Sequence, residues 1–148
     1  RSIHNAEVES SSLSIATNKN IMEIAILLSG IVAGIIFFQT SIIAPTVFKT
    51  LGPEEAKVLL RTVFPKLFNI LVTIGFLMIT LFFLGIGNIY VAIISIILPF
   101  ICSRLVNATN KARDTGDTKT FHRLHSLSVV LTMIVLLANL SWLILALI

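Results

Sequence analysis

The chain has 148 residues, of which 56% are hydrophobic and 12% charged, and its mean hydropathy is +1.00. Because so few polar side chains cannot cover a water-soluble globule, the composition predicts a single all-α integral membrane domain. The net charge is +4, but no basic and aromatic module accompanies it, which argues against nucleic-acid binding. A single cysteine, Cys102, excludes an internal disulfide framework and a cysteine-based zinc site.

The first 20 residues form a polar, serine-rich tail that cannot bury a core. The sequence starts at Arg1 rather than at methionine, as it would after removal of an organellar targeting peptide. We therefore expect a polar tail, residues 1–20, followed by a transmembrane domain, residues 21–148. The mitochondrial inner membrane is the favoured location, and a bacterial plasma membrane or another organelle membrane is the alternative.

The first apolar span covers about residues 21–43, enough to cross a bilayer as a helix. Gly30 and Gly34 form a GxxxG pattern, which predicts close helix packing, within this chain in preference to a homodimer. Ala44-Pro45 is expected to end or kink the helix, because proline disfavours helical geometry at the residue before it.

A short amphipathic helix is predicted from Pro53 to Phe64. Two acids follow Pro53 in the first turn, and apolar side chains recur at intervals of three and four residues. Such a helix is expected to lie at the membrane interface, and Phe64-Pro65 is expected to bend the chain into the second span.

The stretch from Leu67 to Ser103 contains no Asp, Glu, Lys, Arg or His. As one helix it would be roughly 55 Å long, against about 30 Å of bilayer hydrocarbon, so it must fold back on itself. Gly85-Ile86-Gly87-Asn88 supplies the residues for a turn. We therefore expect a hairpin of two spans, 67–84 and 89–108.

Polar residues recur along one side of each later helix. Because lipid-facing polar groups are costly, we expect these stripes to face other helices or an internal cavity. The stripes are Asn69, Thr73 and Thr80 in the second span, Ser95, Pro99 and Cys102 in the third, and His125, Ser128, Thr132 and Asn139 in a fourth helix, 118–148.

Basic side chains predict the orientation of the bundle. Residues 49–66 contain four Lys or Arg and residues 104–123 contain five, whereas the glycine turn contains none. By the positive-inside rule both basic links face the cytoplasm or the mitochondrial matrix. Tyr90 and Trp142 agree with this, because both fall near the opposite ends of their helices, where amphipathic rings prefer the interface.

Several short motifs occur in a characteristic order along the chain. They are Ala44-Pro45-x-x-Phe48-x-x-Leu51, Phe64-Pro65, Asn110-x-Ala112-Arg113-Asp114-x-Gly116-Asp117 and Phe121-x-x-Leu124-His125-x-x-Ser128. In these motifs the chain resembles the transmembrane-protein-205-like family over about residues 24–140. The resemblance implies a four-helix membrane protein without a defined biochemical activity. Thr132 departs from the pattern, since the family is expected to place an asparagine there.

One cluster of polar residues is predicted at the inner membrane surface. It comprises Asn110, Arg113, Asp117, His122, His125 and Ser128. In a functional interpretation His125 relays protons or, together with Arg113, binds an anionic group. In a structural interpretation His125 is hydrogen-bonded to a neighbouring helix, and Arg113 pairs with Asp117 or with a lipid phosphate.

Motifs that carry chemistry are lacking in the sequence. The three histidines do not provide a bis-histidine haem site across the spans, and there is no P-loop, GxSxG or Ser-His-acid arrangement. We therefore expect no enzymatic activity, no metal and no cofactor.

The favoured function is a non-catalytic accessory or structural subunit of a larger membrane assembly, for example a mitochondrial respiratory-chain complex. Its partners would be other membrane protein subunits and anionic phospholipids, with no nucleic acid. The alternatives are a small carrier or channel for an ion or small solute, and a lipid-interacting protein that shapes the membrane.

Overall fold

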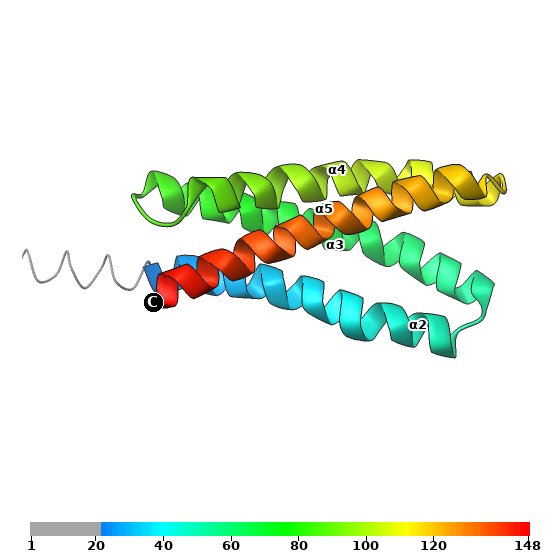
Figure 1. Ribbon diagram of the computed structural model, residues 1–148, viewed down its shortest axis with the longest axis horizontal. Helices are drawn as coiled ribbons and strands as arrows, with labels where there is room; N and C mark the ends of the chain where they lie inside the picture. Colours follow the sequence, from blue (N-terminus) through cyan, green and yellow to red (C-terminus); the bar gives the residue numbers. More distant parts are fainter. Residues whose placement is uncertain (1–21) are drawn as a thin grey trace, which may run out of the picture.

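A computed structural model describes residues 22–148, and this part of the chain is all-α (Figure 1). Four helices within it are long and apolar enough to cross a membrane. The first, Met22–Thr50, includes the π-helical turn η1, Gln39–Ile43, and ends as α2, Ala44–Thr50. The others are α3, Pro53–Phe83, α4, Ile89–Asp114, and α5, Thr118–Leu147. The predicted tail, residues 1–20, lies outside the described residues.

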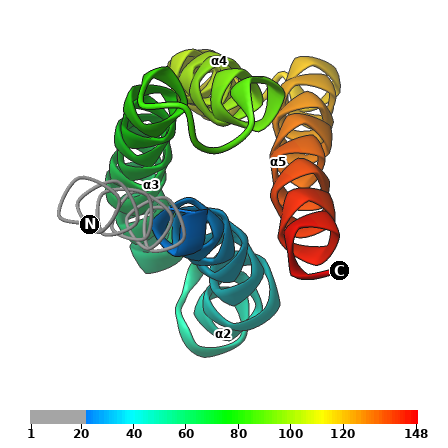
Figure 2. The same ribbon diagram turned by 90° about the vertical axis from the view of Figure 1, so that its left-hand side faces the viewer.

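The helices form an open ring in chain order (Figure 2). Helix α3 packs on α4, and α4 packs on α5. The first helix and α5 meet near the glycine-turn end, where a Cβ on Gly30 would lie 3.5 Å from Leu143 Cδ1. Toward the opposite end the two helices diverge (Figure 1).

The core at the centre of the bundle is drawn from all of these helices. Its buried members are Val32, Ile36, Phe68, Leu71, Cys102 and Val135. A close helix contact occurs at Gly75, where an added Cβ would lie 2.9 Å from the carbonyl carbon of Ser95. This residue therefore allows the backbones of α3 and α4 to approach each other, the role that small residues have in membrane helix packing.

The predicted hairpin turn is confirmed. Gly85 and Gly87 have φ values of +86° and +99°, a region that side chains with a Cβ rarely adopt. The Asn88 side chain then caps α4 by accepting hydrogen bonds from the backbone N–H groups of Tyr90 and Val91, at 2.9 and 3.2 Å. The charge-free stretch accordingly folds back on itself at this point.

The first helix does not end at Ala44-Pro45 but continues to Thr50. The irregularity takes the form of the π turn before the proline, in which the Ala44 N–H bonds to the Gln39 carbonyl. Proline lacks an N–H and crowds the carbonyl four residues earlier, and a wider turn at this position accommodates both effects.

The predicted short helix from Pro53 to Phe64 is not a separate element. It is the first part of α3, which passes through Pro65 as one helix. The Ala56 and Leu60 side chains in this part pack on Val47 of α2. An interior proline forfeits one helical hydrogen bond, and packing against α2 on one side of Pro65 and the core on the other offsets that loss.

The polar stripes of α4 and α5 face inward, as predicted. Ser95, Pro99 and Cys102 are buried, and Asn139 donates a hydrogen bond of 2.9 Å from Nδ2 to Ser95 Oγ. Asn139 is fully buried, so this bond links α4 and α5 inside the bundle.

The stripe on α3 faces outward, so it faces neither another helix of this bundle nor an internal cavity, which were the neighbours predicted within this chain. Asn69, Thr73 and Thr80 are all exposed on this chain. The hydroxyls of Thr73 and Thr80 donate to carbonyls one turn earlier, at 2.9 and 3.0 Å. Because these bonds satisfy both hydroxyls within α3 itself, neither threonine requires a neighbouring helix.

Candidate functional site

A cavity of about 390 Å³ lies near the basic end of the bundle. This volume falls within the range of about 300–1,000 Å³ that is usual for small-molecule sites. Its walls come from the first helix, α3, α4 and α5, and they are mostly apolar, with Ile36, Phe64, Phe68, Val106 and Met133 among the lining residues.

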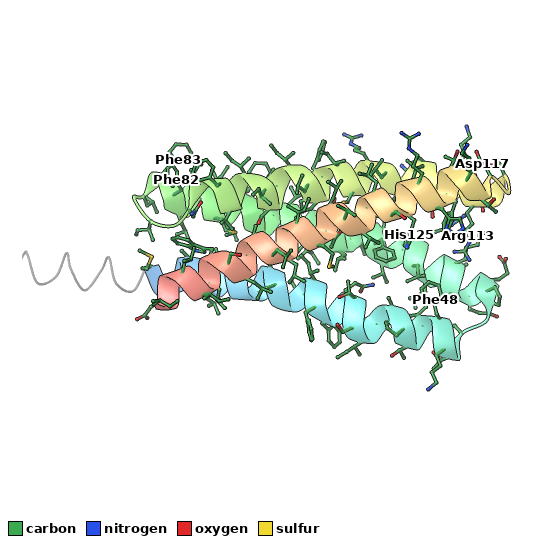
Figure 3. The ribbon with its side chains drawn as sticks, in the orientation of Figure 1. Phe48, Phe82, Phe83, Arg113, Asp117 and His125 are labelled. Carbon is green, nitrogen blue, oxygen red and sulfur yellow. The ribbon has the colours of Figure 1, made fainter. Side chains whose placement is uncertain are left out.

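Basic side chains line the same cavity. Lys57 and Arg61 reach it from α3, Arg113 from α4 and His125 from α5. Figure 3 shows Arg113 and His125 near one end of the bundle, far from the hairpin turn. An apolar cavity with cations on one side suits a molecule that has both an apolar body and an anionic group.

Asp114 holds two of these cations in place. Its Oδ1 atom lies 2.6 Å from Arg61 Nη2 and 3.1 Å from Lys57 Nζ. Arg61 Nη2 also donates to the Asn110 carbonyl, at 3.3 Å. The hydrogen bond from Arg61 lowers the pKa of the Asp114 carboxyl most, and the one from Lys57 lowers it further. Asp114 lies at the polar end of α4.

The charges around the cavity do not cancel. Lys57, Arg61 and Arg113 line it, while Asp114 is the acidic partner of the first two. Glu54 lies 3.6 Å from Lys57, but its side chain is 81% exposed, so water screens that pair strongly. An excess of positive charge therefore remains at the cavity.

Phe121 organises the α5 side of the site. Its ring stacks on His125, with centroids 5.8 Å apart and planes 4° apart, and the Arg113 guanidinium lies 5.9 Å from the Phe121 centroid. The ring thus supports both side chains, and the Arg113 contact is a cation–π interaction.

The structure brings together four of the six predicted site residues. Asn110, Arg113, His125 and Ser128 all line the cavity. Asp117 instead caps α5 by accepting a 3.0 Å hydrogen bond from Thr120 N, which lowers its carboxyl pKa. The expected Arg113–Asp117 ion pair is not present among the described residues. His122 is exposed, and its ring lies edge-on to the Phe121 ring, with the two ring centroids 5.5 Å apart.

Sequence reasoning missed Gln39, Lys57 and Arg61. Gln39 lines the cavity and is only 5% exposed, yet its Nε2 atom has no hydrogen-bond partner within residues 22–148. Arg61 Nε is likewise buried and without a partner in that range. A signal for Gln39 was available, because it is the only amide side chain in the charge-free stretch 24–48.

Unpaired buried donors are costly, and water or a ligand commonly satisfies them. The Gln39 amide and the Arg61 guanidinium are therefore groups through which this cavity can hold an oxygen-rich molecule. No group of three or more His, Cys, Asp or Glu side chains able to hold a metal ion occurs in the described part of the chain.

The chain matches no family model, no curated protein and no solved structure with which it was compared. The resemblance to the transmembrane-protein-205-like family therefore stays a prediction.

Proposed function

We propose that this is a non-catalytic, four-pass membrane protein that binds an amphiphile with an anionic head in the cavity near the basic end of the bundle. The observation that carries the proposal is the excess of cationic side chains, Lys57, Arg61 and Arg113, on a mostly apolar cavity. A purely hydrophilic anion would leave the apolar walls unused, and a neutral hydrocarbon would leave the cations uncompensated.

The edges of the cavity support access from the bilayer. Phe48 of α2 and Val129 of α5 line the cavity and are 63% and 45% exposed. Apolar side chains thus lead from the cavity to the outer surface on both helices, which suits a hydrocarbon tail that extends into lipid.

The location of the site in the membrane follows from the basic links. With residues 49–66 and 104–123 on the cytoplasmic or matrix side, the cavity lies in the inner leaflet, near its headgroups. The first part of α3, with Glu54 and Lys57, then lies at the interface. A location in the mitochondrial inner membrane stays a prediction.

The proposal is tested by lipid binding to the full chain in detergent micelles, measured with phosphatidic acid and with phosphatidylcholine of the same acyl chains. Arg113→Gln should weaken phosphatidic acid binding by about tenfold to a hundredfold, the value of one hydrogen bond to a charged group. It should change phosphatidylcholine binding little, because the choline ammonium offsets the phosphate charge.

Arg104→Gln is the matched control, since Arg104 also lies on α4 but contacts Phe100, at 5.0 Å, away from the cavity. This change should leave the affinity for phosphatidic acid nearly unaltered. Equal losses in the two variants would show general attraction of anionic lipid to a basic surface, and the cavity site would be rejected.

A second function, an accessory subunit of a larger membrane assembly, is favoured by the outer face of α3. Asn69 is exposed there, and a lipid-facing amide is costly unless another helix covers it. A photo-crosslinking residue at position 69 in native membranes should capture one discrete protein. Capture of lipid alone would refute this function and leave the binding proposal untouched.

A further inference from the structure

Gln39 is the pocket-lining group that the cationic site leaves unexplained. Its side chain is 5% exposed and its Nε2 atom lacks a hydrogen-bond partner within residues 22–148. Arg61 and Lys57 already account for an anionic head through charge, so a second acceptor on the ligand is needed to satisfy this amide.

The π turn that begins at Gln39 accommodates Pro45, and turns of this kind also occur frequently at functional sites. Here the Gln39 carbonyl accepts the hydrogen bond of Ala44 N–H, so the backbone of the turn is satisfied while the side-chain donor is not.

The depth of Gln39 in the bundle indicates what the second acceptor is. Thr50 and Pro53 are joined by two residues, so the link between their helices is short. At 1.5 Å per residue, Gln39 lies roughly 16 Å from Thr50 and Arg61 roughly 12 Å from Pro53. Measured along its own helix, the Gln39 backbone is therefore farther from the link than the Arg61 backbone, by about 4 Å.

We propose that Gln39 donates a hydrogen bond to an ester carbonyl of a glycerophospholipid whose phosphate is held by Arg61 and Arg113. In such a lipid the ester carbonyls follow the phosphate toward the hydrocarbon, in the order in which the cavity presents its donors. A free fatty acid has one polar group and would leave Gln39 unsatisfied. The inference rests on the proposed amphiphile site and specifies the ligand class.

The test compares diester with diether phosphatidic acid of the same chain length, which differ in the carbonyl oxygens. Binding to the full chain in detergent micelles is measured for each lipid, and the ratio of the two dissociation constants is the readout. The unaltered protein should bind the diester about threefold to tenfold more tightly, as expected for one hydrogen bond.

Gln39→Met keeps the length of the side chain and removes its amide, so it should bring the ratio close to one. Asn107→Met is the matched control, because Asn107 is an exposed amide on α4 that does not line the cavity. It should retain the preference for the diester. Circular dichroism and thermal melting establish that each variant is folded. If Gln39→Met does not fold, Gln39→Asn replaces it.

The possible results separate the two proposals. Equal binding of both lipids by the unaltered protein, with sensitivity to Arg113→Gln, would overturn the ester assignment and keep the anionic site. A diester preference that persists in folded Gln39→Met would overturn the role of Gln39. Failure of both lipids to bind would overturn the anionic site itself.

Discussion

Replacing Gly75 by alanine tests whether the close approach of α3 and α4 holds the bundle together. The added Cβ would lie 2.7 Å from Ile96 Cγ1, 2.9 Å from the Ser95 carbonyl carbon and 3.0 Å from its oxygen. The Ile96 side chain can move, but the Ser95 backbone cannot move without separating the two helices.

The magnitude is the difference between two opposing effects. Overpacking a tight contact costs about 1–3 kcal/mol, and a backbone contact this close places the cost near the upper end. Alanine in place of glycine inside a helix raises the free energy of unfolding by about 1 kcal/mol. We therefore expect Gly75→Ala to lower the free energy of unfolding by roughly 2 kcal/mol.

Unfolding by increasing SDS in mixed micelles measures this difference. Gly34→Ala is the control, because Gly34 also lies within a helix and a Cβ there would have no atom within 4 Å. It should be neutral or stabilise the protein by up to about 1 kcal/mol. If Gly75→Ala proves as stable as Gly34→Ala, the contact between α3 and α4 is not as described.

Three further predictions concern charge, buried polarity and topology. Because the folded pKa of Asp114 is lowered, its carboxylate stabilises the fold above the unfolded pKa of about 4 and loses this effect as the pH falls further. The fall in melting temperature below about pH 4 should thus be smaller in Asp114→Asn, and an equal fall would contradict the ion pairs. A double-mutant cycle of Ser95→Ala and Asn139→Leu should give a coupling of about 0.6–1.7 kcal/mol, whereas additive effects would mean that their hydrogen bond contributes nothing. Cysteines replacing Lys57 and Lys119, in a cysteine-free background, should react with an impermeant reagent from the same side; labelling from opposite sides would refute the orientation.

The helical hairpin was predictable because chain length and bilayer thickness allow one solution. The stretch from Leu67 to Ser103 had to turn, and the glycines at 85 and 87 were the residues able to do so. The behaviour of Pro45 and Pro65 was not predictable in the same way. Whether a proline breaks a helix depends on packing on either side of it, and only the folded chain reveals that packing.

The outward stripe on α3 shows a related limit. Asn69, Thr73 and Thr80 share one face, but spacing alone does not say toward which neighbour that face points. Hydroxyls also satisfy themselves on carbonyls of their own helix, so a row of threonines is weak evidence for an interior surface. The Ser95–Asn139 pair was more informative, because an asparagine amide has more donors and acceptors to satisfy than one hydroxyl.

The site was predictable on α4 and α5 but not on the other helices. Asn110, Arg113 and His125 flank one short link, so their proximity followed from the chain itself. Lys57 and Gln39 join them through contacts between helices, which periodicity does not encode. Of the two partners predicted for Arg113, Asp117 and a lipid phosphate, the first is wrong for a local reason, because the Asp117 carboxylate at the start of α5 caps that helix.

The π turn on the first helix also bears on how the length of that span can vary. Such a turn holds one surplus residue, so the segments before and after it keep the angular phase of an uninterrupted α-helix. Loss of a single residue between Gln39 and Ile43 should leave Ile36 in the core and Val47 against Leu60. Where the residue lost is Gln39 itself, the bundle would be retained without the polar group inside its cavity.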